Sequence, residues 1–170
     1  PPKISIGMPA YNSERTIASA IDSLLAQSFK DFELIVSDNA SSDSTLEIVQ
    51  RFAAADPRIQ LVRQAQNIGA NANYTYVARC ARGKYFKWAS SSDWYDSTFL
   101  ERCIEFLELN NDAVLAYPRT RVFQNIPSKY LEYDSDIDVC EENPEDRLMH
   151  VIRKIRLNNV MNGLIRTEYL

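Results

Sequence analysis

Glycine and histidine are scarce in this chain, and each shortage excludes a kind of site. Only four of the 170 residues are glycine, and the loop after the first expected strand lacks the Gly-x-Gly-x-x-Gly pattern of a dinucleotide-binding fold. The single histidine, His150, falls in an expected helix. Packing or solvation is its ordinary role there, so the sequence does not indicate a histidine-based catalytic triad.

Cysteine is also rare, and long apolar runs are missing. Cys80, Cys103 and Cys140 are odd in number and far apart, which fits neither a zinc site nor a disulfide framework, so we interpret them as reduced thiols of a cytoplasmic protein. No stretch approaches the roughly 18 to 20 apolar residues of a membrane span. We therefore expect no transmembrane segment in this chain. A parent protein that is peripheral at the inner face of the membrane is the alternative.

The bulk composition suits one globular domain. The chain is 45% hydrophobic and 25% charged, enough to bury a core. Its formal net charge of −4 argues against nucleic acid as a partner. It begins with Pro1-Pro2-Lys3, neither a signal peptide nor an initiator methionine, so we interpret it as a piece of a longer protein.

Strand and helix patterns alternate along the first two thirds of the chain. The expected strands are residues 4–8, 32–37, 58–63, 84–89 and 113–123, and the expected helices are residues 13–27, 44–55, 71–82 and 98–110. This alternation predicts an α/β fold with a mostly parallel sheet and helices on both faces. Ligands of such sheets bind beyond the carboxyl ends of the strands. The loops there should therefore carry the chemistry.

Capping residues mark the expected helix ends. Ser13 can cap the first helix, Asp43 or Ser44 the second, and Gly83 should end the third. Residues 124–139 are polar and acidic and indicate a long loop or hairpin. Within and after that segment we expect a solvated acidic run, made of Asp134, Asp136, Asp138, Glu141 and Glu142. Asn143 to Asp146 then starts a helix whose apolar face is Leu148, Val151, Ile152 and Ile155.

An acidic loop follows the second strand. Asp38 comes directly after a β-branched apolar run, and Asp43 lies five residues later. A carboxylate at Asp38 can accept hydrogen bonds, for example from the imide N–H of a uracil, but it can equally form an Asx turn or cap the next helix. These two interpretations of Asp38 are evenly matched. Asp43 is better explained as a helix cap.

Two other loops carry residues suited to a nucleotide. The ring of Tyr11 can stack on a base, which is worth roughly 1–3 kcal/mol, or it can be a half-buried loop tyrosine. Pro9 and Asn12 shape the turn and cap the helix. Gly69 permits a positive φ, and the helix start at residues 67–71 offers N–H groups to an anion such as a diphosphate.

The loop after the fourth strand is a candidate metal site. Ser90-Ser-Ser-Asp93 places hydroxyls and one carboxylate at a strand end. Mg²⁺ usually takes only one or two carboxylates together with phosphate oxygens, so Asp93 can hold Mg²⁺ or Mn²⁺ against a diphosphate. The loop can instead be a capping cluster for the next helix, and we assign Asp96 to that role.

Taken in order, these motifs resemble family 2 of the inverting glycosyltransferases, which have the GT-A fold. The resemblance is carried by residues 6–12, 23–28, 33–45, 67–69 and 83–93. Each motif is weak alone, but the ordered set is specific. It covers residues 3–110 well and the remainder loosely.

The resemblance implies a role for each motif. Pro9 and Tyr11 would contact the base, Asp38 would hydrogen-bond uracil, and residues 67–71 would lie near the nucleotide. Asp93 matches the last acidic residue of an Asp-rich metal motif. The expected nucleotide-binding residues are Pro9, Tyr11, Asn12, Asp38, Asn67, Gly69, Asn71 and Ser92, with Asp93 as the metal ligand.

The chain departs from the family pattern in two places. Ser90 and Ser92 stand where aspartates are usual, which should weaken metal affinity. The family's catalytic base belongs to an acidic pair on a later helix, after a segment that residues 162–170 resemble. Glu145-Asp146 lies too early to be that pair. We therefore expect residues 1–170 to be one GT-A domain, and we expect the catalytic base beyond Leu170.

The resulting hypothesis is an inverting transfer of a sugar from a nucleotide-sugar donor, most simply a UDP-sugar. The acceptor would be a hydroxyl of a glycan or of a lipid-linked acceptor, and no nucleic acid would take part. Two alternatives stay open. One is a catalytically inactive nucleotide-sugar-binding domain. The other is a sugar nucleotidyltransferase, which would be expected to carry a glycine-rich loop with a basic residue after the first strand.

Overall fold

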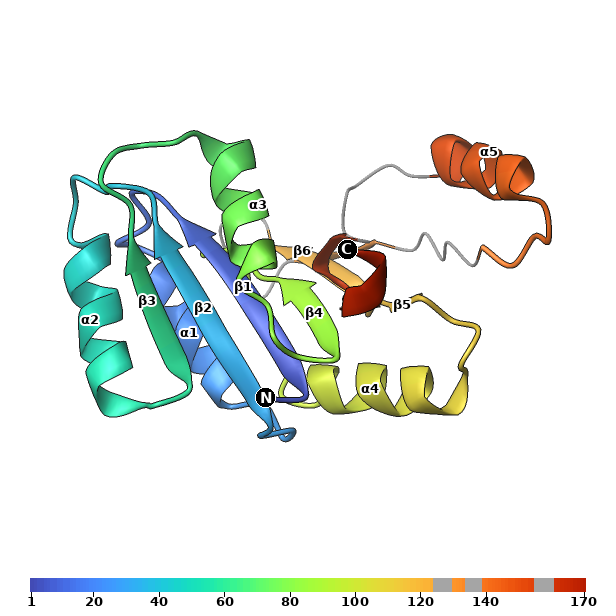
Figure 1. Cartoon of the computed structure of the whole chain (residues 1–170), viewed down its shortest axis with the longest axis horizontal. Coiled ribbons are helices and arrows are strands. Elements are labelled where there is room, and N and C mark those ends of the chain that lie inside the picture. The colour runs from blue at the N-terminus through green and yellow to red at the C-terminus, as the bar shows by residue number, and fades with distance from the viewer. Residues whose placement is uncertain (124–129, 134–138, 155–160) are drawn as a thin grey trace.

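The computed structural model describes residues 1–123, 130–133, 139–154 and 161–170, and shows a three-layer α/β fold (Figure 1). Its main sheet has six strands in the order β3-β2-β1-β4-β8-β5. The strands are β1 (Ile4–Ala10), β2 (Phe32–Asp38), β3 (Ile59–Arg63), β4 (Tyr85–Trp88), β5 (Leu115–Ala116) and β8 (Leu164–Arg166). The first four are parallel, and β8 pairs antiparallel with both β4 and β5. The expected mostly parallel sheet is confirmed.

Helices cover both faces of the sheet, as expected. They are α1 (Ile17–Leu25), α2 (Thr45–Ala55), α3 (Ala70–Arg79) and α4 (Phe99–Leu109). The chain also forms α5 (Pro144–Lys154) and the 3-10 helix η2 (Thr167–Tyr169). Helices α1, α2 and α4 contribute to the larger core, and α3 packs on the opposite face. Within the described ranges, no helix is long and apolar enough to cross a membrane.

Strand alternation sorts the apolar side chains between these two cores. Leu34 and Val36 of β2 belong to the larger core, while Ile35 between them packs with Val77 of α3 on the other face. This is the period-2 rule of a strand buried on both sides. Gly7 of β1 faces α3, where a Cβ atom would lie 2.7 Å from a methyl carbon of Val77. Helix α3 can approach the sheet this closely because position 7 has no side chain.

Strand register brings the loops to one edge. Ala10 pairs with Asp38 across β1 and β2, and Gly7 pairs with Trp88 across β1 and β4. The loops that follow these three strands therefore emerge side by side. These loops lie next to one another because the strands are parallel.

Two expected helix ends were wrong. Helix α1 begins at Ile17, and its cap position is Thr16, not Ser13. The Ser13 hydroxyl is instead within hydrogen-bond distance of the Tyr11 carbonyl and the Ser91 hydroxyl. Gly83 does not end α3, which stops at Arg79. A Cβ atom on Gly83 would lie 2.7 Å from the backbone nitrogen of Ser5, so glycine allows close contact with β1.

The single strand expected at residues 113–123 is two strands. Strand β5 joins the main sheet, while β6 (Thr120–Phe123) pairs with β7 (Tyr130–Tyr133) in a separate hairpin. The hairpin expected beyond residue 123 is thus partly confirmed. Residues 124–129, 134–138 and 155–160 lie outside the described residues, and with them Asp134, Asp136, Asp138 and Ile155.

Helix α5 lies apart from the sheet in Figure 1 and has no buried residue. Its start is as expected, because the Asn143 side chain accepts the Glu145 N–H at 2.9 Å. Leu148 and Ile152 of the expected apolar face are exposed.

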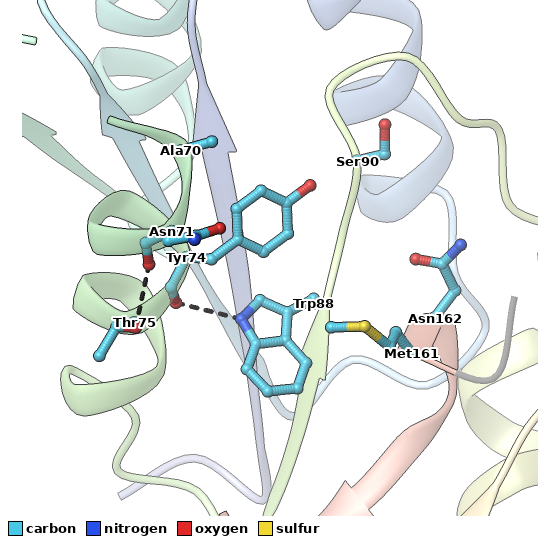
Figure 2. A pocket seen from close by; sticks show the side chains of 8 residues that line it. All are labelled: Ala70, Asn71, Tyr74, Thr75, Trp88, Ser90, Met161 and Asn162. Carbon is cyan, nitrogen blue, oxygen red and sulfur yellow. Dashed lines mark hydrogen bonds between the residues drawn. The ribbon is translucent and has the colours of Figure 1, made fainter. Parts of the chain in front are cut away.

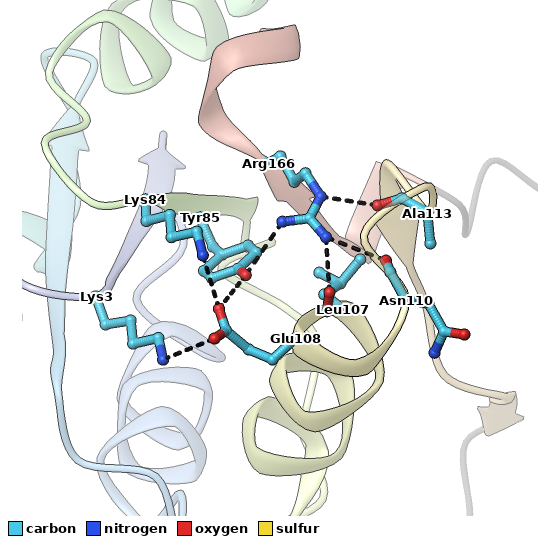
Figure 3. A network of polar contacts seen from close by, with 8 residues as sticks. All are labelled: Lys3, Lys84, Tyr85, Leu107, Glu108, Asn110, Ala113 and Arg166. Atoms are coloured by element: carbon cyan, nitrogen blue, oxygen red, sulfur yellow. Dashed lines mark hydrogen bonds and ion pairs between the residues drawn. The ribbon is translucent and has the colours of Figure 1, made fainter.

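A buried arginine ties β8 to α4 (Figure 3). Arg166 is 7% exposed and donates to the carbonyls of Leu107 and Asn110, at 2.6 and 3.1 Å. These are carbonyls at the end of α4, which have no partner within the helix. Arg166 also donates to the Tyr85 hydroxyl, which donates in turn to Glu108. Strand β8, which begins two residues after Asn162, is therefore anchored at its far end.

Candidate functional site

Side chains of the first two loops fasten those loops together. The Asn12 carboxamide accepts the Ser42 N–H at 2.9 Å, and the Asn12 N–H donates to the Ser41 hydroxyl. Asp43 accepts the backbone N–H of Glu14 at 3.1 Å and that of Thr45 at 3.0 Å. The interpretation of Asp43 as a residue of the helix start is confirmed. Asn12 has φ 47°, a value that asparagine tolerates, and its contacts are those of a residue that shapes the turn.

Asp38 is a buried acceptor at the end of β2. It is 1% exposed, and one carboxylate oxygen accepts the Ser41 N–H at 3.3 Å. The other oxygen, Oδ1, has no hydrogen-bond partner among the residues that the structure describes. Leaving a buried acceptor unpaired costs free energy. An incoming N–H or O–H donor would relieve that cost.

An asparagine pair shapes the neighbouring wall of the site. Asn67 accepts hydrogen bonds from the Asn39 side chain at 3.0 Å and from the Gly69 N–H at 2.9 Å. The side-chain amide oxygen of Asn39, Oδ1, accepts the Ile68 N–H at 2.9 Å. Gly69 has φ 83°, in the region that favours glycine, and occupies the N-cap position of α3. The expected positive φ at Gly69 is confirmed, and the free N–H groups of α3 start beside β2.

Tyr11 follows β1 and is 50% exposed. Pro9, two residues earlier, is buried within β1 and pairs with Ser37, so the expectation that it shapes the turn was wrong. The tyrosine ring is thus accessible next to the end of β2. A flat ligand group can stack there, since an exposed aromatic face beside hydrogen-bonding groups suits a base.

The fourth loop contains the candidate metal ligand. The hydroxyls of Ser90 and Ser92 lie 2.9 Å apart, and the Tyr95 hydroxyl accepts the Ser90 N–H at 3.1 Å. Asp93 is half-buried, and this burial raises the pKa of its carboxyl group, while the charge of Lys87 acts in the opposite direction. The N-cap of α4 is Thr98, and Asp96 accepts the Thr98 N–H at 3.0 Å, so Asp96 belongs to the turn that leads into α4.

The donor set of this loop limits how a metal could be held. Among the described residues, no group of three His, Cys, Asp or Glu side chains is placed to bind a metal ion. Asp93 contributes one carboxylate, and Ser90 and Ser92 contribute only neutral hydroxyls. Mg²⁺ and Mn²⁺ accept such a sparse set when phosphate oxygens and waters complete the coordination. The residues therefore fit a divalent cation that arrives with a diphosphate.

A pocket of about 580 Å³ lies between α3 and the start of β8 (Figure 2). Its lining residues are Ala70, Asn71, Tyr74, Thr75, Trp88, Ser90, Met161 and Asn162. Figure 2 shows Tyr74 of α3 and Asn162 on opposite sides. The indole N–H of Trp88 donates to the Tyr74 carbonyl at 3.1 Å, which fixes the ring. None of the lining side chains carries a charge. Aromatic walls with a few amides are typical of a site for a small neutral group.

The structure brings the expected residues to one edge, but divides them between two areas. Tyr11, Asp38 and Asn67 lie around the ends of β1 and β2. Asn71 lies with the Ser90 loop at the pocket, on the other side of β1. The Ser13 and Ser91 hydroxyls, 2.8 Å apart, join these areas. The individual ligand roles stay predictions.

We assign the catalytic base to no described residue. Leu170 directly follows η2 and is 48% exposed. It is not among the residues that line the pocket. Its aliphatic side chain has no proton-accepting group, so Leu170 itself is no candidate for the base. The expectation that the base lies beyond Leu170 stays a prediction.

Sequence reasoning missed two residues beside the fourth loop. Asn162 donates from its side chain to Asp93 at 3.4 Å. Lys87 is fully buried in β4. The only available signal for Lys87 was a charge in an otherwise aromatic strand, Tyr85-Phe-Lys-Trp88. Nothing in the sequence placed Asn162 near Asp93, because the contact spans 69 positions.

Comparison with solved structures shows the same fold. The N-terminal part of TarS from S. aureus, in complex with UDP-GlcNAc, superimposes with a TM-score of 0.69 at 20% identity over 97% of this chain and 45% of that chain. The mannosyltransferase PcManGT from Pyrobaculum calidifontis, in complex with GDP-Man and Mn²⁺, gives a TM-score of 0.69 at 17% identity, covering 98% of this chain and 45% of that chain. These likenesses establish the GT-A architecture.

Comparison of sequences identifies the family. The chain is 39% identical over 108 residues to the putative glycosyltransferase EpsE of Bacillus subtilis, covering 63% of this chain and 39% of that protein. It is 34% identical over 115 residues to chondroitin synthase of Escherichia coli, covering 68% of this chain and 16% of that protein. It thus spans well under half of either relative. The model of glycosyl transferase family 2 matches residues 5–166. The chain therefore belongs to glycosyl transferase family 2.

Proposed function

We propose that this chain binds the nucleotide-sugar donor of an inverting glycosyltransferase, with UDP as the first candidate nucleotide. The observation that carries the proposal is the unpaired Oδ1 of buried Asp38. Asp38 pairs with Ala10, the residue just before exposed Tyr11, so the two residues stand at adjacent strand ends. A pyrimidine imide N–H supplies the missing donor, and the tyrosine ring supplies a stacking surface.

The diphosphate would extend from the base toward Asp93. When bound, Mg²⁺ or Mn²⁺ would offset the charge on the departing diphosphate. Asp93 would hold the metal on the protein side, and the N–H groups at the start of α3 would face the phosphates. The TarS and PcManGT structures, which hold UDP-GlcNAc and GDP-Man with Mn²⁺ respectively, support a donor of this class.

Transfer itself is a displacement at the anomeric carbon. The acceptor hydroxyl oxygen bonds to that carbon while the bond to the diphosphate oxygen breaks, and the electron pair leaves with the diphosphate. A carboxylate base takes the hydroxyl proton. Glu145 and Asp146 are exposed at the start of α5, where their ordinary role is to complement the helix dipole. We place the base beyond Leu170, and we propose a hydroxyl of a glycan or of a lipid-linked acceptor as the group that receives the sugar.

Calorimetric titration with UDP, GDP and dTDP, each with and without Mn²⁺, tests donor binding. We expect one diphosphate to bind, more tightly with Mn²⁺. The Asp38→Ala variant should bind at least about tenfold more weakly, because it loses a hydrogen bond to a charged acceptor. Asp31→Ala, at the opposite end of β2, is the matched control. No binding of any nucleotide, or equal binding by Asp38→Ala, would remove the proposal.

A catalytically inactive binding domain is the second candidate. The observation that favours it is that Asp93 is the single carboxylate among residues 90–93, where Ser90 and Ser92 carry neutral hydroxyls. We expect little or no transfer by residues 1–170 alone. Sugar transfer by these residues at the rate of a longer parent chain would contradict both this candidate and our placement of the base.

A further inference from the structure

Lys87 is a charged residue inside the larger core. Strand alternation places Tyr85, Lys87 and Ala89 on the face covered by α1 and α4, and Lys87 is 0% exposed. Burying an ammonium group is costly unless its donors are satisfied. Burial lowers the pKa of Lys87 to about 7, while nearby Cys103 and Asp93 favour the charged form. An apolar residue of similar volume would avoid this cost in free energy, so the need to fill space does not explain why position 87 is a lysine.

The contacts of Lys87 reach the side of the pocket that lies opposite α3. Its ammonium group donates to the carbonyl of Asn162 at 2.7 Å and to that of Trp88 at 3.0 Å. It also lies 4.2 Å from the centre of the Tyr95 ring, a cation–π contact. The hydroxyl of that same Tyr95 accepts the N–H of Ser90. Asn162 and Ser90 both line the pocket.

Asn162 connects Lys87 to Asp93, the candidate metal ligand. Its backbone carbonyl is held by Lys87, and its side-chain amide donates to the Asp93 carboxylate at 3.4 Å. Arg166 holds the other end of the same short strand through the carbonyls at the end of α4. Strand β8 has three residues. Pairing of so short a strand is not sufficient to fix the position of Asn162, which precedes it. Lys87 supplies the missing attachment at the site end.

We propose that Lys87 is a positioning residue that holds Asn162 and the 90–93 loop in place for the diphosphate and sugar of the donor. The inference rests on the proposed function. Lys87 itself does not touch the ligand, because it is fully buried. It acts through the Asn162 carbonyl on one side and the Tyr95 ring on the other.

A purely structural role for Lys87 makes a different prediction. The base end of the donor lies at Tyr11 and Asp38, and in the described part of the chain the hydrogen bonds and ring contacts of Lys87 do not extend to either residue. If Lys87 is a positioning residue, its substitution should weaken the binding of a nucleoside diphosphate and leave the binding of the nucleoside unchanged. General loosening of the fold would weaken both ligands alike.

The test compares the unmodified chain with Lys87→Met, which has a similar volume and no charge. Calorimetry with UDP and GDP in Mn²⁺, and NMR titration with uridine and guanosine, give the dissociation constants. We expect the diphosphate to bind about tenfold or more weakly, while the nucleoside changes by less than about twofold. Lys84→Met is the matched control, since Lys84 is 59% exposed and forms an ion pair with Glu108.

Asn162→Ala is a second variant, which removes the side-chain bond to Asp93 and keeps the backbone carbonyl that Lys87 holds. It should show the same selective loss of diphosphate binding whether or not Lys87→Met folds. If Lys87→Met folds, adding it to Asn162→Ala should cost less than Lys87→Met costs alone. Equal losses for nucleoside and diphosphate, or no loss in either variant, would overturn the inference while leaving donor binding intact. An unmodified chain that binds none of the four ligands would instead remove the proposed function, and the inference with it.

Discussion

The side chain of Asn162 donates a hydrogen bond to the carboxylate of Asp93, across 3.4 Å and 69 positions of sequence. This contact joins the antiparallel edge of the sheet to a loop of its parallel half. The candidate donor site is therefore built from two parts of the chain. The base end, the metal end and the residues that support them can therefore be tested by separate substitutions.

Tyr11 is the candidate stacking residue at the base end. We expect Tyr11→Ala to weaken nucleotide binding by about tenfold, since base–aromatic stacking is worth roughly 1–3 kcal/mol. Tyr11→Phe should bind like the unmodified chain, because it keeps the ring. The melting temperature should not change, as Tyr11 is half exposed. Calorimetry with the preferred diphosphate measures all three proteins, and unchanged binding by Tyr11→Ala would place the base elsewhere.

Asp93 is the only carboxylate that we assign to a metal. In Asp93→Asn, the gain in UDP or GDP affinity on adding Mn²⁺ should disappear, while affinity without metal stays within about twofold. The reason is that a neutral amide is a poor ligand for a hard divalent cation. Asp96→Asn, in the same loop, is the control, because the Asp96 side chain accepts the Thr98 N–H in the turn before α4. Retention of the full Mn²⁺ effect in Asp93→Asn would show that other groups hold the ion.

Glu33 should control part of the acid sensitivity of the fold. Burial alone would raise its pKa, but hydrogen bonds from Arg82, Ser5 and Gln60 lower it below the usual value. A lowered folded-state pKa stabilises the fold above the unfolded pKa, about 4.3, and the gain is lost as pH falls through the folded value. Glu33→Gln should thus cost about 1–2 kcal/mol at neutral pH.

Urea unfolding of Glu33→Gln and the unmodified chain at several pH values measures this difference. The gap between the two should be widest above about pH 5 and should shrink below about pH 4. Glu47→Gln, an exposed residue of α2, should leave the pH profile as it is. A gap that grows toward low pH would contradict the lowered pKa of Glu33.

Arg166 should contribute strongly to stability. Arg166→Met leaves the Leu107 carbonyl without its side-chain donor, leaves the Asn110 carbonyl with only the Ala113 N–H, and removes the link to Tyr85. We expect a loss of about 3 kcal/mol in the free energy of unfolding, because buried bonds from a charged donor are worth about 1.5–3 kcal/mol each and are not additive. Lys84→Met, at the exposed edge of the same network (Figure 3), should lose less than about 1 kcal/mol. Equal losses in chemical denaturation would show that Arg166 is not the anchor of β8.

Local sequence patterns correctly predicted those features of the fold that depend on a single helix or strand. The parallel half of the sheet, helices α2 and α4, and the loops after the strands follow from period-2 and period-3.6 hydrophobic patterns. The end of α3 did not follow, because Gly83 serves a close approach to β1 and not a helix cap. Ser13 likewise forms loop contacts and does not cap α1. In both cases a tertiary contact outweighed the local signal.

The sequence by itself determined the fold class, the family motifs and the edge of the sheet where the site lies, because these depend on near neighbours along the chain. Only the tertiary structure decided which residues share a wall of the site. It buried Lys87 under the 90–93 loop, brought Asn162 to Asp93, and left Oδ1 of Asp38 without a partner among the described residues. Such contacts arise when strands far apart in sequence pair, and a side chain's surroundings are then set by elements that its own neighbours cannot reveal.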